Sequence, residues 1–427
     1  MSTTRTFQDM LDDYIPDRVF IEEIVRRDFL LSNIERDDDW TGAGGTGGQN
    51  GATNSNYVVK FKGAGASSVS YGQLSAAADI AQDKYVRGII TAQKEVWGSM
   101  IFNHRDLMEN KKISEQKFLD ILPNSIEDFA DYFKGVISVN LLNGSQFAKL
   151  TADGTAGGNI IVDRPDRFVI NQKVIVQNNV GVNVTGYVNT IDMDTFTINL
   201  TVARYGAGGV VNCAGMLLVD VAQCYNDGAQ TAGQPFLSLR EALLAATHGG
   251  GATLHGQTKT AYPYLQAINI PGDKITATNI MTQIFDALTK VRTFGKGAPK
   301  AVIMSYKNYG SAIKSVEDKK GNFNVIPGSQ ATSEFGWDEI TIGSVAKGNL
   351  KLVGVQEMDD DIIIFLDWRA LKFASNGFIQ KVKSPDGLEY FVQRAQTGYQ
   401  YIIDMCVFGE LVVDRPSYCG IIYGISY

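Results

Sequence analysis

The sequence predicts an α+β protein, and three features of the chain lead to this class. Residues 125–142 carry apolar side chains at three- and four-residue steps, which is typical of an amphipathic helix. Residues 145–230 are rich in Val, Asn, Thr and Gly and alternate apolar with polar side chains, which indicates strands. Residues 399–413 form one run of strand pattern that is far longer than the usual five or six residues.

Composition bounds the class of protein further. The chain has 427 residues, enough for two or three domains, and 44% apolar with 20% charged residues is typical of a folded protein. Only 3 His and 4 Cys are present, which excludes large metal clusters and a disulfide framework. The N-terminus lacks a signal peptide and no long apolar run occurs, so we expect a cytoplasmic origin and no membrane partner.

The negative charge is concentrated at the N-terminus. Residues 1–40 hold eleven acidic residues against five arginines, whereas the whole chain has a net charge of only −7. An arm that grips nucleic acid needs clustered Lys and Arg to release counterions from phosphates. The charge therefore argues against tight nucleic-acid binding, while a near-neutral body allows self-association.

The N-terminal hundred residues predict extended parts that one copy cannot stabilise alone. We expect a helix over 17–34 with Asp17 as its N-cap, and then a two-armed β-excursion over 40–100. Six glycines occupy the ten positions 42–51, and ordering such a stretch costs about 1–2 kcal/mol per residue with almost no apolar side chain to offset it. A neighbouring chain would have to hold this segment.

The remaining segments alternate between helix and strand. The helix over 125–142 is expected to begin at Asn124 or Ser125 and to end at Asn143-Gly144, and residues 145–230 to form a small barrel or sandwich. The pattern predicts further helices over 235–248, 278–294 and 308–317, a buried strand over 301–304, short strands over 337–395, and a long C-terminal ribbon made of 399–413 and 418–423.

Two glycine-rich runs are weak matches to nucleotide-binding motifs. Gly42–Gly47 fits the dinucleotide fingerprint in letters, but an acidic run precedes it instead of a strand. Gly249–Gly256, framed by His248 and His255, lacks the Gly-Lys-Ser/Thr ending of a phosphate loop. We interpret both runs as flexible loops.

Catalytic and metal-binding patterns are equally weak. His104 and Asp106 come without a nucleophile motif, so a capped turn or a salt bridge is the better interpretation. The four cysteines, Cys213, Cys224, Cys406 and Cys419, form no Cys-x-x-Cys and are expected to be buried free thiols. We therefore expect no catalytic residues, no metal and no cofactor.

The order of these parts resembles the major capsid protein of tailed bacteriophages, which has the Hong Kong 97-like fold. An N-terminal arm leads to a glycine-rich β-loop, then to the strand Glu95–Phe102, the long helix, a mixed segment and a long terminal strand. The resemblance implies an arm over 1–39, an extended loop over 40–102, a peripheral domain from 103–142 and 380–427, an inserted all-β domain over 143–230 and an axial domain over 231–379.

The resemblance also implies a function without enzymatic activity. The chain would assemble into hexamers and pentamers of an icosahedral head shell that encloses double-stranded DNA, with portal, scaffold and cement proteins as partners, in the virion after assembly in the host cytoplasm. Contacts between subunits would involve the arm tip and loop, at Trp40, Gly42, Gly44, Gly47, Tyr57, Phe61, Tyr71 and Tyr85.

Three alternatives remain open from the sequence alone. An encapsulin-like compartment shares the fold but would package an enzyme. A nucleotide-dependent enzyme would use Gly42–Gly47 or Gly249–Gly256. A β-rich tail or adhesion protein would form fibres or trimers instead of closed particles.

Overall fold

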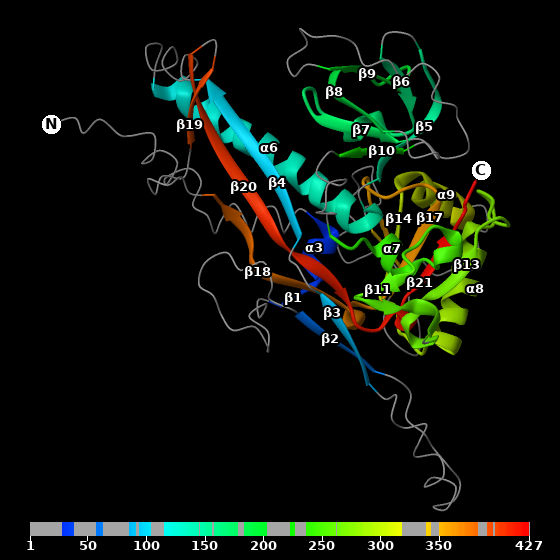
Figure 1. The fold of residues 1–427 in the computed structure, drawn as a ribbon. Coiled ribbons are helices and arrows are strands. Elements are labelled where there is room, and N and C mark those ends of the chain that lie inside the picture. The colour runs from blue at the N-terminus through cyan, green and yellow to red at the C-terminus, as the bar shows by residue number, and fades with distance from the viewer. Residues whose placement is uncertain are drawn as a thin grey trace, which may run out of the picture.

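The computed structural model arranges the chain as three bodies (Figure 1). One is a long sheet with a long helix along it, one is a closed β-barrel, and one is a compact sheet with two helices. The residues described are 28–37, 57–62, 85–90, 94–103, 115–144, 146–155, 158–177, 183–202, 223–226, 236–261, 263–317, 339–342, 350–382, 391–395 and 398–426.

The long sheet is organised by strand β20 (Gly398–Val413), whose 16 residues confirm the expected long strand. One edge of β20 pairs antiparallel with β4 (Lys94–Asn103). Along its other edge, residues 405–413 of β20 pair with β18 (Leu371–Lys381), and residues 398–402 pair with β19 (Phe391–Ala395). A short strand, β1 (Glu35–Asp37), extends the sheet by pairing parallel to β18.

The long helix α6 (Glu115–Asn143) covers one face of this sheet. Val96 and Met100 on β4 are buried beneath it. Between them lies Gly98, where a Cβ atom would stand 2.7 Å from the ring of Phe133 and 3.1 Å from that of Phe129. The two phenylalanine rings stack with centroids 5.7 Å apart, so the helix sits on the strand only because position 98 carries no side chain.

Helix α6 begins at Glu115, nine or ten residues before the predicted N-cap. The prediction placed a cap at Asn124 or Ser125 because Asn and Ser favour N-cap positions. Glu115, Gln116 and Lys117 are good helix formers, and the helix runs through the proline at the loss of one backbone hydrogen bond. The predicted end at Asn143-Gly144 is confirmed, with Gly144 in the left-handed region at φ +84°.

Residues 146–226 form a closed barrel, which decides between the barrel and sandwich that the sequence left open. Its strand order is β10-β5-β6-β9-β8-β7, so the first and last strands of the segment are neighbours. The strands are β5 (Gln146–Thr155), β6 (Asn159–Val162), β7 (Lys173–Gln177), β8 (Asn183–Asp192), β9 (Thr197–Thr201) and β10 (Gln223–Asn226).

The barrel interior is packed with aliphatic side chains. Seven of these side chains are completely buried, namely Ile160, Val162, Val174, Val176, Val188, Ile198 and Leu200. A small barrel has an interior just wide enough for such side chains. The barrel is therefore a solid body and offers no internal ligand cavity at these positions.

The third body is a mixed sheet of six strands in the order β13-β21-β17-β14-β16-β15. Helices α8 (Ile280–Lys290) and α9 (Tyr306–Glu317) pack with one face of it in a second hydrophobic core. The strands are β13 (Ile268–Pro271), β14 (Ala301–Met304), β15 (Glu339–Ile342), β16 (Leu350–Gly354), β17 (Ile362–Leu366) and β21 (Gly420–Tyr423).

Both faces of this sheet are buried, which explains why its central strands carry no polar residue. On β17, Ile363 and Phe365 belong to the core under the helices, whereas Ile362, Ile364 and Leu366 belong to the large core shared with the rest of the subunit. An uninterrupted apolar run is the expected sequence of a strand covered on both sides.

The C-terminal ribbon predicted from 399–413 and 418–423 is divided between two sheets. Strand β21 pairs with β13 and β17 in the compact sheet instead of lying beside β20. The short 3-10 helix Pro416–Tyr418 turns the chain between the two strands, because proline fixes the backbone at its first position. β21 is nearly all apolar and needs burial on both faces, which the compact sheet provides and the edge of the long sheet would not.

Two turns share one sequence and one geometry. Asp163-Arg164-Pro165 and Asp414-Arg415-Pro416 each lead into a three-residue 3-10 helix with proline at its start. The arginine backbones are nearly identical, at φ −134°, ψ 71° for Arg164 and φ −141°, ψ 68° for Arg415. The same local solution therefore redirects the chain in the barrel and after β20.

The predicted N-terminal helix is present in the described residues as α3 (Phe29–Asn33), with Asp28 as its N-cap. Leu30, Leu31 and Ile34 are buried in the large core of the same subunit. Residues 28–37 therefore pack on the sheet and helix of their own subunit through these apolar side chains, and the arm over 1–39 stays a prediction. Asp17, the expected cap, lies outside the described residues.

The helix predicted over 235–248 is broken into α7 (Leu239–Leu243) and a 3-10 turn, Ala246–His248. The Nζ of Lys259 donates to the carbonyl oxygens of Leu244, at 2.9 Å, and Glu241, so a buried lysine takes up carbonyls at the end of the helix. The helix predicted over 278–294 corresponds to α8, which continues into a π-turn, Val291–Gly295. The buried strand predicted over 301–304 is confirmed as β14.

A pair of glycine substitutions tests the packing of α6 on β4. Gly98→Ala should lower the free energy of unfolding by about 1–3 kcal/mol, because the new methyl group overlaps the Phe133 ring. Gly135→Ala is made on helix α6 itself, where nothing lies within 4 Å of the new Cβ. This variant should raise the free energy of unfolding by about 0.5–1 kcal/mol. Denaturant unfolding measures both, and equal effects would contradict the close approach at Gly98.

Candidate assembly surfaces

The residues predicted to contact neighbours fall into two groups. Five of them lie outside the described residues: Trp40, Gly42, Gly44, Gly47 and Tyr71. The other three lie in the hairpin of β2 (Tyr57–Lys62) and β3 (Tyr85–Ile90), where Tyr57 pairs with Ile90, Phe61 with Val86 and Lys62 with Tyr85. The described part of the β-excursion predicted over 40–100 thus contains a paired hairpin, and contact of these residues with a neighbour stays a prediction.

The β2–β3 hairpin projects from the body on the side away from the barrel (Figure 1). Its base is anchored, since Val59 and Ile90 are buried in the large core, while Ile89 is 47% exposed. Among the described strands, β2 and β3 pair only with each other. A two-stranded ribbon is marginally stable in water, so this hairpin is the first candidate assembly surface.

The face of the long sheet opposite α6 carries exposed aromatic surface. Trp97 on β4 is 50% exposed and meets Phe408 of β20 edge to face, with ring centroids 6.1 Å apart. Next along the same face, the hydroxyl of Ser99 donates to Asp404 at 2.6 Å. Large exposed aromatic residues are enriched in protein interfaces, so this sheet face is a second candidate assembly surface.

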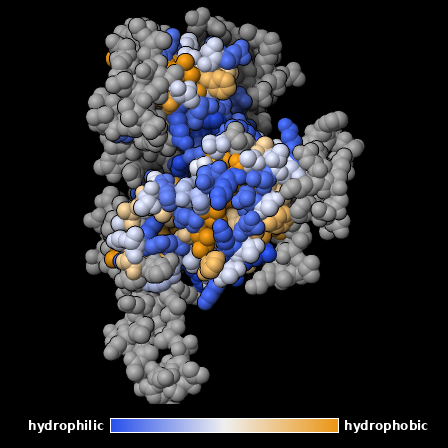
Figure 2. Space-filling model, turned by 90° about the vertical axis from the view of Figure 1, so that its right-hand side faces the viewer, coloured by the Kyte–Doolittle hydropathy of each residue, from blue (hydrophilic) through white to orange (hydrophobic). Residues whose placement is uncertain are grey.

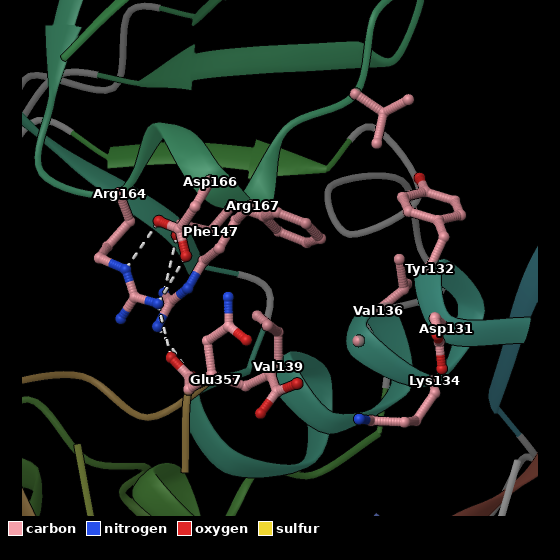
Figure 3. A pocket seen from close by; sticks show the side chains of 13 residues that line it. Asp131, Tyr132, Lys134, Val136, Val139, Phe147, Arg164, Asp166, Arg167 and Glu357 are labelled. Atoms are coloured by element: carbon pink, nitrogen blue, oxygen red, sulfur yellow. Dashed lines mark hydrogen bonds and ion pairs between the residues drawn. The ribbon is translucent and has the colours of Figure 1, made fainter. Parts of the chain in front are cut away.

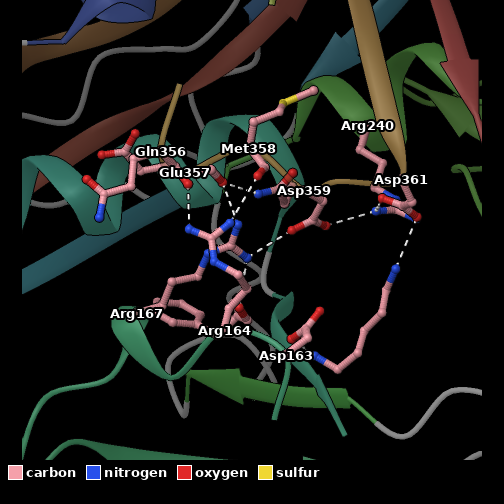
Figure 4. Close-up of polar contacts among 12 residues, drawn as sticks. Asp163, Arg164, Arg167, Arg240, Gln356, Glu357, Met358, Asp359 and Asp361 are labelled. Atoms are coloured by element: carbon pink, nitrogen blue, oxygen red, sulfur yellow. Dashed lines mark hydrogen bonds and ion pairs between the residues drawn. The ribbon is translucent and has the colours of Figure 1, made fainter. Parts of the chain in front are cut away.

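A network of ion pairs joins the barrel to the rest of the subunit, and sequence reasoning missed it (Figure 4). Arg167 of the barrel contacts Asp359 at 2.9 Å, and both side chains are at most 10% exposed. Arg240, after the barrel, reaches Asp359 at 3.0 Å and Asp361 at 2.9 Å. Lys149 on β5 adds a contact to Asp361 at 3.0 Å.

Backbone carbonyls complete the network. Arg167 donates to the carbonyl oxygens of Phe147, at 2.8 Å, and Glu357, at 2.7 Å. Arg164 donates to Gln356 and Met358 and pairs with Asp166 at 2.8 Å. Figure 2 shows hydrophilic side chains gathered where the barrel meets the rest of the molecule. The barrel is therefore held in a fixed orientation by charge-assisted hydrogen bonds.

Electrostatics in the network favour the charged forms. Burial works to raise the pKa of Asp361, but Arg240 and Lys149 hold it below its usual value. Burial likewise opposes the charge on Arg240, and the two aspartates still raise its pKa. A buried pair of this kind stabilises only while both partners are present, because the remaining charge would be left without compensation.

The same junction contains a cavity of about 350 Å³ (Figure 3). Helix α6 forms one wall with Tyr132, Lys134 and Val136, and the base of the barrel forms another. The barrel arginines on its wall already bind Asp166, Asp359 and backbone carbonyls. We interpret the cavity as a seam between the bodies. In the described residues no cluster of three or more metal-ligating side chains occurs and no helix is suited to cross a membrane.

The glycine-rich run Gly249–Gly256 leads into a small hairpin over residues 253–258, and its flexibility stays a prediction. Strands β11 (Thr253–Leu254) and β12 (Gln257–Thr258) pair across a turn in which His255 and Gly256 have φ +47° and +79°. This is the turn geometry that suits two-residue hairpins, and His is tolerated in it. A phosphate loop requires a following helix, which the hairpin replaces. The other run, Gly42–Gly47, lies outside the described residues.

In the described residues, two histidines contact neighbouring groups and two cysteines are buried. The Nε2 of His255 accepts from the N–H of Val413 at 3.1 Å, and burial, with Lys94 and Lys259 nearby, lowers its pKa to about 3. His248 stacks on Tyr423 and lies 2.9 Å from its hydroxyl. The predicted burial is confirmed for Cys406 and Cys419, whose pKa burial raises to about 12. His104, Asp106 and Cys213 lie outside the described residues.

A buried carboxyl group fastens the N-terminal segment to the long helix. Asp28 is 4% exposed, accepts from the N–H of Leu31 at 2.7 Å and receives the hydroxyl of Ser138 on α6. Burial raises its pKa to about 6, and nearby Glu357 adds to the rise, while Lys134 and the backbone N–H of Leu31 oppose it. The protonated form is thus favoured in the folded state.

This carboxyl group makes stability depend on pH. Because the folded pKa lies above the unfolded value, its contribution is fully present below about pH 4 and is lost as the pH rises to about 6, a change of about 3 kcal/mol. Asp28→Asn removes the titrating group and keeps an acceptor for Leu31. Relative to wild type, the variant should therefore gain stability between pH 4 and pH 7 in denaturant unfolding. A difference independent of pH would contradict the burial of Asp28.

The ion network gives a matched pair of substitutions. Arg240→Met should lower the free energy of unfolding by about 3 kcal/mol, because it leaves Asp359 and Asp361 with fewer compensating charges. Lys307→Met breaks the neighbouring but exposed pair with Asp360, 3.9 Å long, and should cost at most about 1 kcal/mol. Similar losses in the two variants, measured by thermal unfolding, would show that the network is solvated.

Comparison with known proteins gives structural likenesses only. No family model matches the chain, and no curated protein sequence matches it. The fold is similar to that in the capsid of Myoviridae Phage XM1, with 10% identity and a TM-score of 0.36 over 93% of this chain and 91% of that chain.

Two further likenesses cover most of the chain. The Cyanophage A-1(L) capsid matches with 11% identity and a TM-score of 0.42, over 87% of this chain and 88% of that chain. The SrpI encapsulin complex of Synechococcus elongatus PCC 7942 matches with 7% identity and a TM-score of 0.35, over 81% and 78%.

Proposed function

We propose that this chain is the major capsid protein of a tailed bacteriophage, a structural subunit without enzymatic activity. Copies of it would form the hexamers and pentamers of a closed icosahedral shell around double-stranded DNA. The observation that carries this proposal is the β2–β3 hairpin, which leaves the body as a two-stranded ribbon with a buried base and, among the described strands, no partner of its own.

The remainder of the subunit suits repeated contacts between rigid copies. The long sheet is stiffened by α6 along one face and presents Trp97 and Phe408 on the other. The ion network fixes the barrel to the same frame. A shell needs many modest reciprocal contacts made by a body that does not deform, so that contact geometry is repeated from copy to copy.

We keep the domains that the resemblance to capsid proteins implied, with two changes. Residues 28–37 belong with the body, and β21 belongs with the compact sheet, which corresponds to the proposed axial part. The acidic N-terminal stretch suits a chamber that holds DNA without gripping it, because few counterions would be released from the phosphates. Portal, scaffold and cement proteins are the proposed partners, with assembly in the host cytoplasm before the virion forms.

Deletion of the glycine-rich segment tests the proposal. Purified wild-type protein should form capsomers or closed particles in light scattering and electron microscopy. Deleting Gly42–Gly51 should leave a folded subunit of unchanged circular dichroism and abolish particles, because neighbours would hold this segment in the shell. Wild-type protein that stays monomeric at all concentrations would contradict the proposal, as would full assembly of the deletion variant.

The contents of the particles separate the two kinds of shell. Nucleic acid inside particles from infected cells supports the phage capsid, whereas an enclosed enzyme supports an encapsulin-like compartment. Calorimetry with nucleotides tests the enzyme alternative, for which binding to the monomer is required.

A further inference from the structure

The β2–β3 hairpin is attached to the body at two points that flank its exit. On one side, the N–H of Ile89 donates to the carbonyl oxygen of His255 at 2.9 Å. The turn of the β11–β12 hairpin therefore lies directly against β3, and a Cβ at Gly256 would stand 3.6 Å from the carbonyl oxygen of Ile89. On the other side, β4 begins at Lys94, four residues after the end of β3.

Lys94 forms the second attachment through a buried carboxylate. Its Nζ lies 3.1 Å from Glu410 of β20, whose side chain is 3% exposed. Glu410 also accepts from the backbone N–H groups of Leu237 and Leu411. Burial raises the pKa of Glu410, and Lys94 with these two donors opposes the rise. The carboxylate is thus fixed from three directions, and it fixes the start of β4 in turn.

Both attachments lead to the same end of β20. The ring of His255 accepts from Val413, three residues beyond Glu410 on that strand. The left-handed backbone of His255, at φ +47°, aims its carbonyl at Ile89 while its ring reaches β20. One residue therefore connects the hairpin to the strand that organises the long sheet.

From this geometry we propose that Lys94, Glu410 and His255 are positioning residues, which set the direction in which the β2–β3 hairpin leaves the subunit. This inference rests on the proposed function, because in a shell the direction of a projecting hairpin determines the angle between neighbouring subunits. The three residues would then act on the uniformity of particle size. Their role is separate from holding the subunit together, since the hairpin base also packs through Val59 and Ile90.

Glu410→Gln is the variant that tests the proposal with least disturbance. The amide oxygen can still accept from Leu237 and Leu411, no buried charge is left, and Lys94, 28% exposed, can turn to water. In hydrogen exchange of the unassembled subunit, the Ile89 amide should exchange about tenfold faster, as expected for weakening one hydrogen-bonded contact. In electron microscopy, the closed particles should lose their uniform diameter.

Lys372→Met is the matched control. It removes another ion pair of the same sheet, Lys372 with Glu35 at 3.3 Å, which lies between β1 and β18 and involves none of Lys94, Glu410 and His255. This variant should leave both the Ile89 exchange and the particle diameter unchanged. If Glu410→Gln does not fold, His255→Asn is the second variant, because it leaves the ion pair between Lys94 and Glu410 in place. Asn tolerates the left-handed backbone at this position, but its shorter side chain cannot reach the N–H of Val413.

The outcomes separate this inference from the proposed function. If wild-type protein forms no particles, the proposed function fails, and the exchange at Ile89 alone decides whether the three residues hold the hairpin. If wild-type particles form, uniform particles from Glu410→Gln or His255→Asn would overturn the inference. A loss of uniformity in Lys372→Met as well would also overturn it, because the effect would then be general to the sheet.

Discussion

The architecture depends on the contact between α6 and the long strands β4 and β20. A strand of 16 residues is unusually long, because most strands have five or six residues and a flat ribbon of greater length has too little cover to stay straight. Here one continuous helix covers it, and the missing side chain at Gly98 lets the rings of Phe129 and Phe133 rest on the backbone. β18, β19 and β1 extend the sheet that this contact stiffens, and β20 also holds the hairpin exit through Glu410 and Val413.

Regular patterns in the sequence predicted much of the fold. The helical spacing of Phe129, Phe133 and Ile137 and the strand pattern over 399–413 both correspond to observed elements. The barrel segment was recognisable because its strands are buried on one face only and therefore alternate. Pairing was harder, since β21 is apolar on both faces and its sequence does not say which sheet it joins.

The candidate surfaces were only partly predictable. Tyr57, Phe61 and Tyr85 were found through the strand pattern of the hairpin, whereas the network of Arg167, Arg240 and Asp359 was missed. Its members lie up to 212 residues apart, so no local pattern connects them. The available signals were an arginine pair in the repeated Asp-Arg-Pro turn and the acidic run at 359–361, but without the fold they look like ordinary surface charges.

The closure of the barrel has a consequence for how such a chain can change over generations. Its entry strand β5 and exit strand β10 are hydrogen-bonded neighbours, so the two ends of the segment leave the barrel side by side. A gene could gain, lose or exchange this segment without rerouting the polypeptide on either side. Any replacement segment would have to supply positively charged side chains for the carboxylates of Asp359 and Asp361. Among the ion pairs drawn in Figure 4, only the one with Arg240 would remain for these aspartates, because Arg167 and Lys149 belong to the barrel.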